Sequence, residues 1–207
     1  MPNEDIVLRL FALCREKNIM LSVCESLTGG LVIDSLISEA GASQFVYEGV
    51  VAYSNLSKIR RLSVKEETLE KFGAVSAETA LEMAEGLFRS GVGAVRATLS
   101  TADGIRAVGT TRLTADSARA VGATLSTTGV AGPDGGSAEK PVGLTYIGVC
   151  VDGRTDAHKF IFGGGRAEIR EQAARKALEL LESAVRGSDT NVIVGSSDSP
   201  QVDNKYE

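Results

Sequence analysis

One stretch near the N-terminus restricts the fold of this chain more than any other. Residues 19–24 (Ile-Met-Leu-Ser-Val-Cys) form a short, mostly apolar run, residues 25–30 (Glu-Ser-Leu-Thr-Gly-Gly) form a turn, and residues 31–37 return to helical spacing. A short apolar run of this kind is typical of a strand that helices cover on both faces. A strand, a tight turn and a helix in this order therefore predict an α/β fold.

The rest of the chain contains further segments of the same kinds. Amphipathic spacing and capping residues predict helices over residues 5–17, 55–62, 64–72, 76–89 and 166–185. Alternating or β-branched segments predict strands over residues 45–54, 141–151 and 157–162, with Asp152 and Gly153 as the turn between the last two.

The middle of the chain contains an imperfect repeat of three short units. Thr98, Thr111 and Thr124 occupy equivalent positions in these units, as do Thr101, Thr114 and Thr127. Three short polar units are too few for a solenoid, so we interpret residues 93–118 as an insertion that forms an appendage, either a local duplication or wrongly translated sequence. Only the third unit continues into a glycine-rich segment. This predicts that residues 120–127 form a strand of the sheet, and that residues 94–119 can be deleted without loss of folding.

The composition excludes several classes of protein. Of the 207 residues 43% are apolar, enough for one domain with a buried core, which we assign to residues 1–186, and we expect the acidic residues 187–207 to form a disordered tail. The net charge is −5 and no apolar run is long enough for a membrane span, so neither nucleic acid nor a membrane is an expected partner. The acidic N-terminus lacks the pattern of a secretory signal, which predicts a cytoplasmic protein.

The cysteine and histidine content restricts the chemistry. The three cysteines lie far apart in the sequence, which is typical of free thiols in a reducing compartment. The single histidine, His158, lies in an expected hairpin strand, where a surface position is the favoured interpretation. Without clusters of these residues no metal site is expected. Any catalysis must therefore depend on Ser, Thr, Tyr, Lys, Arg or carboxylate side chains.

Two predicted loops carry groups that suit nucleophilic catalysis. Ser26 lies where the first strand meets its helix, and free backbone N–H groups there favour a nucleophile or a bound anion. The plainer alternative is that Ser26 or Thr28 only caps the helix. Lys58 follows a strand and can serve as a base if burial lowers its pKa, whereas the alternative is a solvated surface lysine. We expect Lys58 to lie within hydrogen-bonding reach of Ser26.

Two glycine-rich segments are further candidates for ligand binding. Residues 127–141 contain four glycines and two prolines after an apolar strand, which favours either a ligand loop at the carboxyl end of a sheet or a long structural loop. Arg166 follows three glycines and begins a helix, where its charge opposes the helix dipole. An anionic ligand or partner is therefore expected to hold Arg166.

Four motifs occur in an order that matches a known family. They are Glu25-Ser26-x-Thr28-Gly29-Gly30, Tyr53-Ser54-Asn55-x-x-Lys58, Gly73-Ala74-Val75-Ser76 and the segment from Thr128 to Gly143. From about residue 5 to about residue 185, interrupted by the repeat, the chain resembles the CinA C-terminal family, the nicotinamide-nucleotide amidohydrolases or nicotinamide mononucleotide deamidases. The resemblance implies a three-layer α/β/α sandwich with a mixed sheet. It also implies hydrolysis of the carboxamide of nicotinamide mononucleotide to the acid and ammonia.

The same resemblance implies roles for individual residues. Ser26 is the expected nucleophile and Lys58 its general base, with Tyr53 and Thr128 assisting. The expected substrate-binding residues are Thr28, Gly29, Gly30, Gly132, Gly135, Gly136 and Arg166. The family pattern has an Asp before this arginine, where this chain has Gly165. No cofactor and no metal are expected, the expected partner is a small nucleotide substrate, and the protein is expected to be a homo-oligomer.

Two other functions stay open at this point. The chain is a non-catalytic nucleotide-binding or assembly module of the same fold if the insertion displaces the strand that carries Thr128. A pyrophosphatase acting on nucleotides is a weaker alternative, because magnesium requires paired carboxylates. Glu25, Asp34 and Asp134 do not have the spacing of such a pair.

Overall fold

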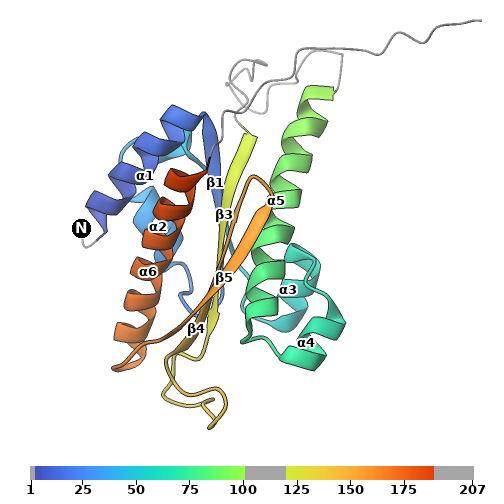
Figure 1. Ribbon diagram of the computed structural model, residues 1–207, viewed down its shortest axis with the longest axis vertical. Helices are drawn as coiled ribbons and strands as arrows, with labels where there is room; N and C mark the ends of the chain where they lie inside the picture. Colours follow the sequence, from blue (N-terminus) through green and yellow to red (C-terminus); the bar gives the residue numbers. More distant parts are fainter. Residues whose placement is uncertain (1–2, 101–119, 189–207) are drawn as a thin grey trace, which may run out of the picture.

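The computed structural model describes residues 3–100 and 120–188, with the backbone alone for residues 92–100 and 120 (Figure 1). The helices are α1 (Glu4–Lys17), α2 (Leu31–Ile37), α3 (Asn55–Leu62), α4 (Glu66–Phe72), α5 (Ala77–Ser100), α6 (Arg166–Gly187) and the 3₁₀ helix η1 (Ala42–Gln44). The strands are β1 (Ile19–Glu25), β2 (Val46–Val51), β3 (Ala120–Gly129), β4 (Leu144–Val151) and β5 (Arg154–Ile161).

The strands form one mixed sheet in the order β2-β1-β3-β4-β5. β1 pairs in parallel with both β2 and β3, whereas β4 pairs in antiparallel fashion with both β3 and β5. Helices α1, α2 and α6 cover one face of the sheet, and α3, α4 and α5 cover the other (Figure 1). This is the predicted three-layer α/β/α sandwich with a mixed sheet.

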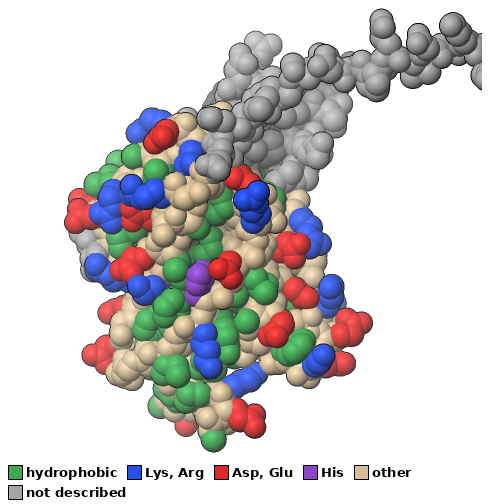
Figure 2. Space-filling view, in the orientation of Figure 1, with side chains coloured by type: hydrophobic (Ala, Val, Ile, Leu, Met, Phe, Trp, Pro, Cys, Tyr) green, Lys and Arg blue, Asp and Glu red, His purple; other side chains and the backbone are tan. Residues whose placement is uncertain are grey.

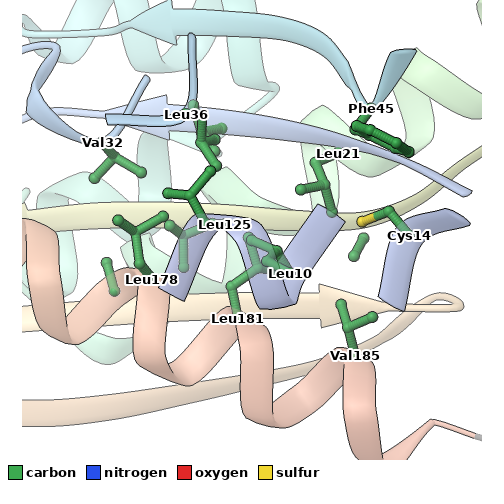
Figure 3. Packing of buried hydrophobic residues seen from close by; sticks show 14 of the residues in the cluster. Leu10, Cys14, Leu21, Val32, Leu36, Phe45, Leu125, Leu178, Leu181 and Val185 are labelled. Carbon is green, nitrogen blue, oxygen red and sulfur yellow. The ribbon is translucent and has the colours of Figure 1, made fainter. Parts of the chain in front are cut away.

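The hydrophobic core lies on both faces of β1. On one face, Leu10 of α1 and Leu178 of α6 pack with Leu125 of β3 in the larger cluster (Figure 3). On the other face, Met83 of α5 packs with Leu62 of α3 in a smaller cluster. Burial on both faces explains why residues 19–24 are mostly apolar and show no strict alternation.

Most of the predicted elements are confirmed. Helices α2 and α3 begin and end at the predicted residues, 31–37 and 55–62. In the β4–β5 turn, Asp152 and Gly153 have φ angles of 53° and 78°, the positive values that a tight two-residue hairpin requires. The strand expected over residues 45–54 ends earlier, at Val51, because Ser54 caps α3 by accepting a hydrogen bond from the N–H of Ser57 (3.1 Å).

The repeat contributes to two different elements. Its third unit forms β3, which confirms the prediction that residues 120–127 are a strand. In its first unit, residues 93–100 continue α5 to Ser100, well beyond the predicted end at residue 89, so this part of the expected appendage belongs to a helix of the domain. Residues 101–119 and the expected tail from residue 189 lie outside the described residues, and Gly187 still belongs to α6.

Acidic and basic side chains are interspersed on the face shown in Figure 2, which has no dense positive patch. His158 is half-exposed on this face, with Nε2 3.6 Å from a carboxylate oxygen of Asp156, as expected for a surface histidine. No helix within residues 3–100 and 120–188 combines the length and the apolar character that crossing a membrane requires. The same residues contain no group of His, Cys, Asp and Glu side chains arranged to hold a metal ion.

Candidate active site

Ser26 and Lys58 meet at the carboxyl end of the parallel strands. Lys58 Nζ lies 3.1 Å from Ser26 Oγ, which confirms the predicted contact. Ser26 directly follows β1, and Lys58 lies in the first turn of α3, shortly after β2. Because β1 and β2 are parallel neighbours, their carboxyl ends reach the same edge of the sheet, and residues far apart in sequence come together there.

The amine of Lys58 is buried without a counter-charge from the described part of the chain. The residue is 1% exposed, so the interpretation as a solvated surface lysine is wrong. Besides Ser26, its Nζ donates to the backbone oxygens of Ala52 (2.9 Å) and Tyr53 (3.4 Å). Burial lowers the pKa of Lys58, and the nearby thiol of Cys24 opposes this effect only in part. Lys58 is therefore suited to act as a base.

Glu25 is a site residue that none of the sequence motifs singled out for a role. Its carboxylate is 1% exposed and accepts hydrogen bonds from the N–H groups of Gly30 (2.9 Å), Val32 (3.2 Å) and Ile33 (2.8 Å). Glu25 thus fills the start of α2, so the expectation of free N–H groups there is wrong. The hydroxyl of Ser26 instead contacts Lys58, and that of Thr28 contacts Thr127, so the interpretation of Ser26 or Thr28 as the helix cap is also wrong.

Thr28, Gly29 and Gly30, which were expected to bind substrate, contact other parts of the protein. The hydroxyl groups of Thr28 and Thr127 lie 2.7 Å apart in the buried interior. Gly29 lies against the guanidinium of Arg170, and the N–H of Gly30 is taken by Glu25. Thr28, Gly29 and Gly30 therefore support the turn from behind, whereas Ser26 and Leu27 face a pocket.

This pocket, of about 280 Å³, opens above the Ser26–Lys58 pair. Its lining residues are Ser26, Leu27, Tyr53, Lys58, Ala74, Val75, Thr128, Gly129, Val130, Ala131, Gly132, Asp134, Gly135 and Arg166. The lining includes seven of the residues that the sequence indicated and omits Gly136, which packs against Val142. A cavity of about 370 Å³ between α1, α2 and α6 is larger but contains no nucleophile–base pair. The candidate site is therefore identified by the Ser26–Lys58 pair and not by the size of the pocket.

Arg166 forms the rim of this pocket together with Tyr53. Its Nη1 donates to the backbone oxygen of Gly132 (2.6 Å), and its Nη2 donates to the hydroxyl of Tyr53 (3.3 Å). At the family's Asp position, Gly165 is the N-cap of α6, and its N–H donates to the Glu168 carboxylate (2.8 Å). Glu168 thus satisfies the helix start from inside the helix, so α6 is capped before Arg166 without an Asp at position 165.

Thr128 connects the pocket floor to the α5 side of the sheet. Its side chain is buried, and its hydroxyl donates to the backbone oxygen of Ala74 (2.6 Å). After a register shift between Met20 and Leu21, β3 pairs with β1 without interruption from Ala123 to Thr127, which lies opposite Glu25, the last residue of β1. The insertion therefore leaves the strand that carries Thr128 in place.

Comparison with known proteins identifies a family and several relatives that resemble this chain. The sequence profile described as the CinA C-terminal domain matches residues 3–102 and 107–185. The chain belongs to this family. A CinA-like protein of Kosmotoga olearia is 43% identical over 182 residues, which are 88% of this chain and 37% of that protein. A putative competence-damage inducible protein of Clostridioides difficile is 46% identical over 178 residues, 86% of this chain and 35% of that protein.

This CinA domain thus spans little more than a third of the length of these curated relatives. Among solved structures, the competence/damage inducible protein CihA from Agrobacterium tumefaciens is 36% identical with a TM-score of 0.71, over 88% of this chain and 94% of that chain. A competence or damage-inducible protein from Enterobacter asburiae is 26% identical with a TM-score of 0.70, over 88% and 97% of the two chains. These structures share the α/β fold of this CinA domain.

Proposed function

We propose that this CinA domain is an amidohydrolase that converts nicotinamide mononucleotide to nicotinic acid mononucleotide and ammonia. The observation that carries the proposal is the 3.1 Å contact between Ser26 Oγ and Lys58 Nζ, a buried amine of lowered pKa. A Ser–Lys pair is one of the arrangements that activate a serine for attack on an amide. The nucleotide substrate follows from the resemblance of the four motifs to the nicotinamide-nucleotide amidohydrolases.

The surroundings of Lys58 orient its lone pair toward Ser26. A neutral amine has two N–H groups and one lone pair. The backbone oxygens of Ala52 and Tyr53 accept from the two N–H groups. In the neutral amine the lone pair is then left for the hydroxyl of Ser26, whose Oγ lies 3.1 Å from Nζ. Lys58 is thus held ready as a base before substrate binds.

The proposed reaction has two steps that share this base. Ser26 Oγ attacks the carboxamide carbon while its proton passes to Lys58 Nζ. Lys58 then gives the proton to the leaving nitrogen, the C–N bond breaks, and ammonia leaves an acyl ester on Ser26. A water molecule, deprotonated by the same amine, attacks the ester and restores the Ser26 hydroxyl. The balance is amide plus water to acid plus ammonia, and each step uses only side chains of this chain.

Arg166 and the glycine-rich loop are the proposed contacts for the rest of the nucleotide. Two N–H groups of Arg166 donate to Gly132 and Tyr53, and the remaining N–H groups are available for a phosphate. Gly132 and Gly135 line the pocket and leave its wall open to a sugar. Binding energy from the phosphate and ribose then positions the carboxamide beside Ser26.

The alternative of a non-catalytic module has less support. It required the insertion to displace the strand that carries Thr128. β3 instead pairs with β1 and β4 along its length, and the Ser26–Lys58 contact is intact. Binding without turnover therefore has no structural cause among the described residues.

Ammonia release from nicotinamide mononucleotide by the purified protein tests the proposal. We expect Ser26→Ala to lower turnover about 10⁴-fold or more, with nucleotide affinity and Tm nearly unchanged. Ser43→Ala, at an exposed serine outside the pocket, is the matched control and is expected to behave like the wild type. Arg166→Ala is expected to raise KM more than it lowers kcat.

Two results would contradict this proposal. If Ser26→Ala keeps wild-type turnover and melts much earlier, the role of Ser26 is structural only. If the wild type binds nicotinamide mononucleotide but releases no ammonia, the chain is a binding module.

A further inference from the structure

Arg170 contacts the catalytic turn, although no sequence motif selected it. It lies on α6, one turn after Arg166, and is partly buried. Its Nε donates to the backbone oxygen of Leu27 (3.0 Å) and its Nη2 to that of Thr28 (2.8 Å). The planar guanidinium thus holds two successive carbonyl groups directly after Ser26. A lysine, with a single charged nitrogen, does not have this fork geometry.

The residue at position 29 makes room for this contact. Gly29 has a φ of +60°, and a Cβ built on it would lie 3.0 Å from Nη2 of Arg170. A side chain at this position would therefore be both strained and crowded against the guanidinium. The turn is built to receive Arg170.

Glu25 and Arg170 hold complementary backbone groups around the turn. Glu25 takes N–H groups at the start of α2, and Arg170 takes the carbonyl groups of Leu27 and Thr28. Ser26 itself is fixed on one side by its N–H, which donates to the backbone oxygen of Thr127 (2.9 Å). On its other side the chain leaves the sheet, and there Arg170 is the side chain that binds the carbonyl groups of Leu27 and Thr28, while Thr127 holds the Thr28 hydroxyl and Glu25 holds the N–H of Gly30.

We propose that Arg170 is a positioning residue that holds Ser26 at its reactive distance from Lys58. This inference rests on the proposed function. Lys58 is held from its own side by two carbonyl groups, so the distance between the two reacting groups depends on how firmly the Ser26 turn is held. Arg170 is not among the residues that line the pocket, and its donors are directed at backbone oxygens. It therefore acts through Ser26 and not through the substrate.

The test compares Arg170→Ala and Arg170→Lys with Arg175→Ala. Arg175 lies further along α6 and pairs with Glu179 (3.2 Å), so its variant controls for loss of an arginine from this helix. We expect Arg170→Ala to lower kcat for nicotinamide mononucleotide about 100-fold with KM within about threefold of the wild type, because small misplacement of a reacting group costs about this much. The kcat of Arg170→Lys is expected to lie between those of Arg170→Ala and the wild type, and the kcat of Arg175→Ala is expected to match the wild type. Millimolar guanidinium is expected to restore part of the activity of Arg170→Ala and none of that of Lys58→Met.

A second measurement does not depend on turnover. A fluorophosphonate probe forms a covalent adduct with an activated serine, and intact mass reports the labelling rate. We expect Arg170→Ala to label about 100-fold more slowly than the wild type, and Ser26→Ala not to label. If the wild type labels but releases no ammonia, the proposed function is wrong, while the labelling rates still test Arg170.

Three results with Arg170→Ala would overturn the inference. The first is wild-type labelling and kcat in Arg170→Ala. The second is a KM raised more than about 10-fold at unchanged kcat, which would make Arg170 a substrate contact. The third is a loss of activity that guanidinium does not restore and that parallels a lowered Tm. If Arg170→Ala does not fold, Arg170→Lys decides, and an unchanged kcat in that variant also overturns the inference.

Discussion

Glu25 and Lys58 are buried to the same extent, each 1% exposed, yet their surroundings differ in kind. The Glu25 carboxylate meets three backbone N–H groups at the start of α2, on one face of the sheet. The Lys58 amine, on the other face, meets two carbonyl groups and the hydroxyl of Ser26. Helix N–H groups stabilise an anion well, whereas burial among neutral groups leaves a cation poorly compensated.

The comparison separates structure from chemistry within one site. A carboxylate that completes a helix start stabilises the fold and keeps the turn after Ser26 in place. An amine buried with too little compensation destabilises the fold in its charged form, and the same loss of solvation lowers its pKa and so favours the neutral form that can act as a base. Replacing Lys58 is therefore expected to lower the activity and raise the stability, whereas replacing Glu25 is expected mainly to lower the stability.

Of the two positions compared, Lys58 is expected to give the larger effect, in the variant Lys58→Met. Removing the base is expected to lower turnover of nicotinamide mononucleotide by at least about 10³-fold. The free energy of unfolding is expected to rise by about 1 kcal/mol or more, because an apolar side chain of similar length replaces an amine whose charged form is disfavoured by burial. Ammonia release and denaturant unfolding measure the two effects. A variant that is both inactive and less stable than the wild type would break the comparison.

Glu25→Gln is expected to have a smaller effect and to act mainly on stability. The amide keeps the shape of the side chain, but it loses the negative charge and places an NH₂ group near three N–H donors. We expect the free energy of unfolding to fall by about 2 kcal/mol. Glu179→Gln, at a carboxylate in exposed ion pairs on α6, is the control, with an expected change below about 1 kcal/mol. An unchanged Tm in Glu25→Gln would show that the carboxylate does not stabilise the start of α2.

The smallest effect is the pH dependence of the stability difference between the wild type and Lys58→Met. The pKa of Lys58 is lower in the folded chain than its ordinary value of 10.5. Between the two values the unfolded chain binds a proton that the folded chain does not, so wild-type stability rises with pH. The penalty is full below the folded pKa and disappears above the unfolded pKa. The advantage of Lys58→Met is therefore expected to narrow as the pH rises toward 10.5.

Unfolding curves of both proteins at several pH values measure this difference. The kcat/KM of the wild type is expected to rise as the pH passes the folded pKa of Lys58 and to level off above it, where the stability gap narrows. A gap that stays constant from about pH 7 to about pH 10 would mean that the pKa of Lys58 is not lowered by folding.

The sequence predicted the parts of the site that depend on topology and on local signals. The contact of Ser26 with Lys58 follows from parallel neighbouring strands, whose carboxyl ends share an edge. Glu25 carried a signal in the sequence, because it is an acidic residue shortly before a helix whose N-cap residue, Gly30, has no side chain to accept from the helix N–H groups. The contacts of Arg170 with Leu27 and Thr28 join residues 143 and 142 positions apart, and only the docking of α6 creates them.

The repeat illustrates the same limit at the level of secondary structure. The sequence Ala-Thr-Leu-Ser occurs at residues 97–100, at the end of α5, and again at residues 123–126, within β3. Local sequence is identical in the two places, so the tertiary surroundings determine which copy becomes the strand. The prediction of the strand at residues 120–127 succeeded because it rested on the glycine-rich segment after the third unit, not on the unit itself.

This duplication has a consequence for how the protein is made. Residues 97–100 leave the ribosome before residues 123–126, when β1 has already been synthesised, so β1 first meets a copy of its partner that must not be retained. Residues 97–100 thus compete with residues 123–126 for pairing with β1 while the chain is being synthesised. This competition is expected to slow folding without changing the stability of the finished sheet. A chain lacking residues 94–119 is expected to refold in fewer kinetic phases, which stopped-flow measurements would resolve.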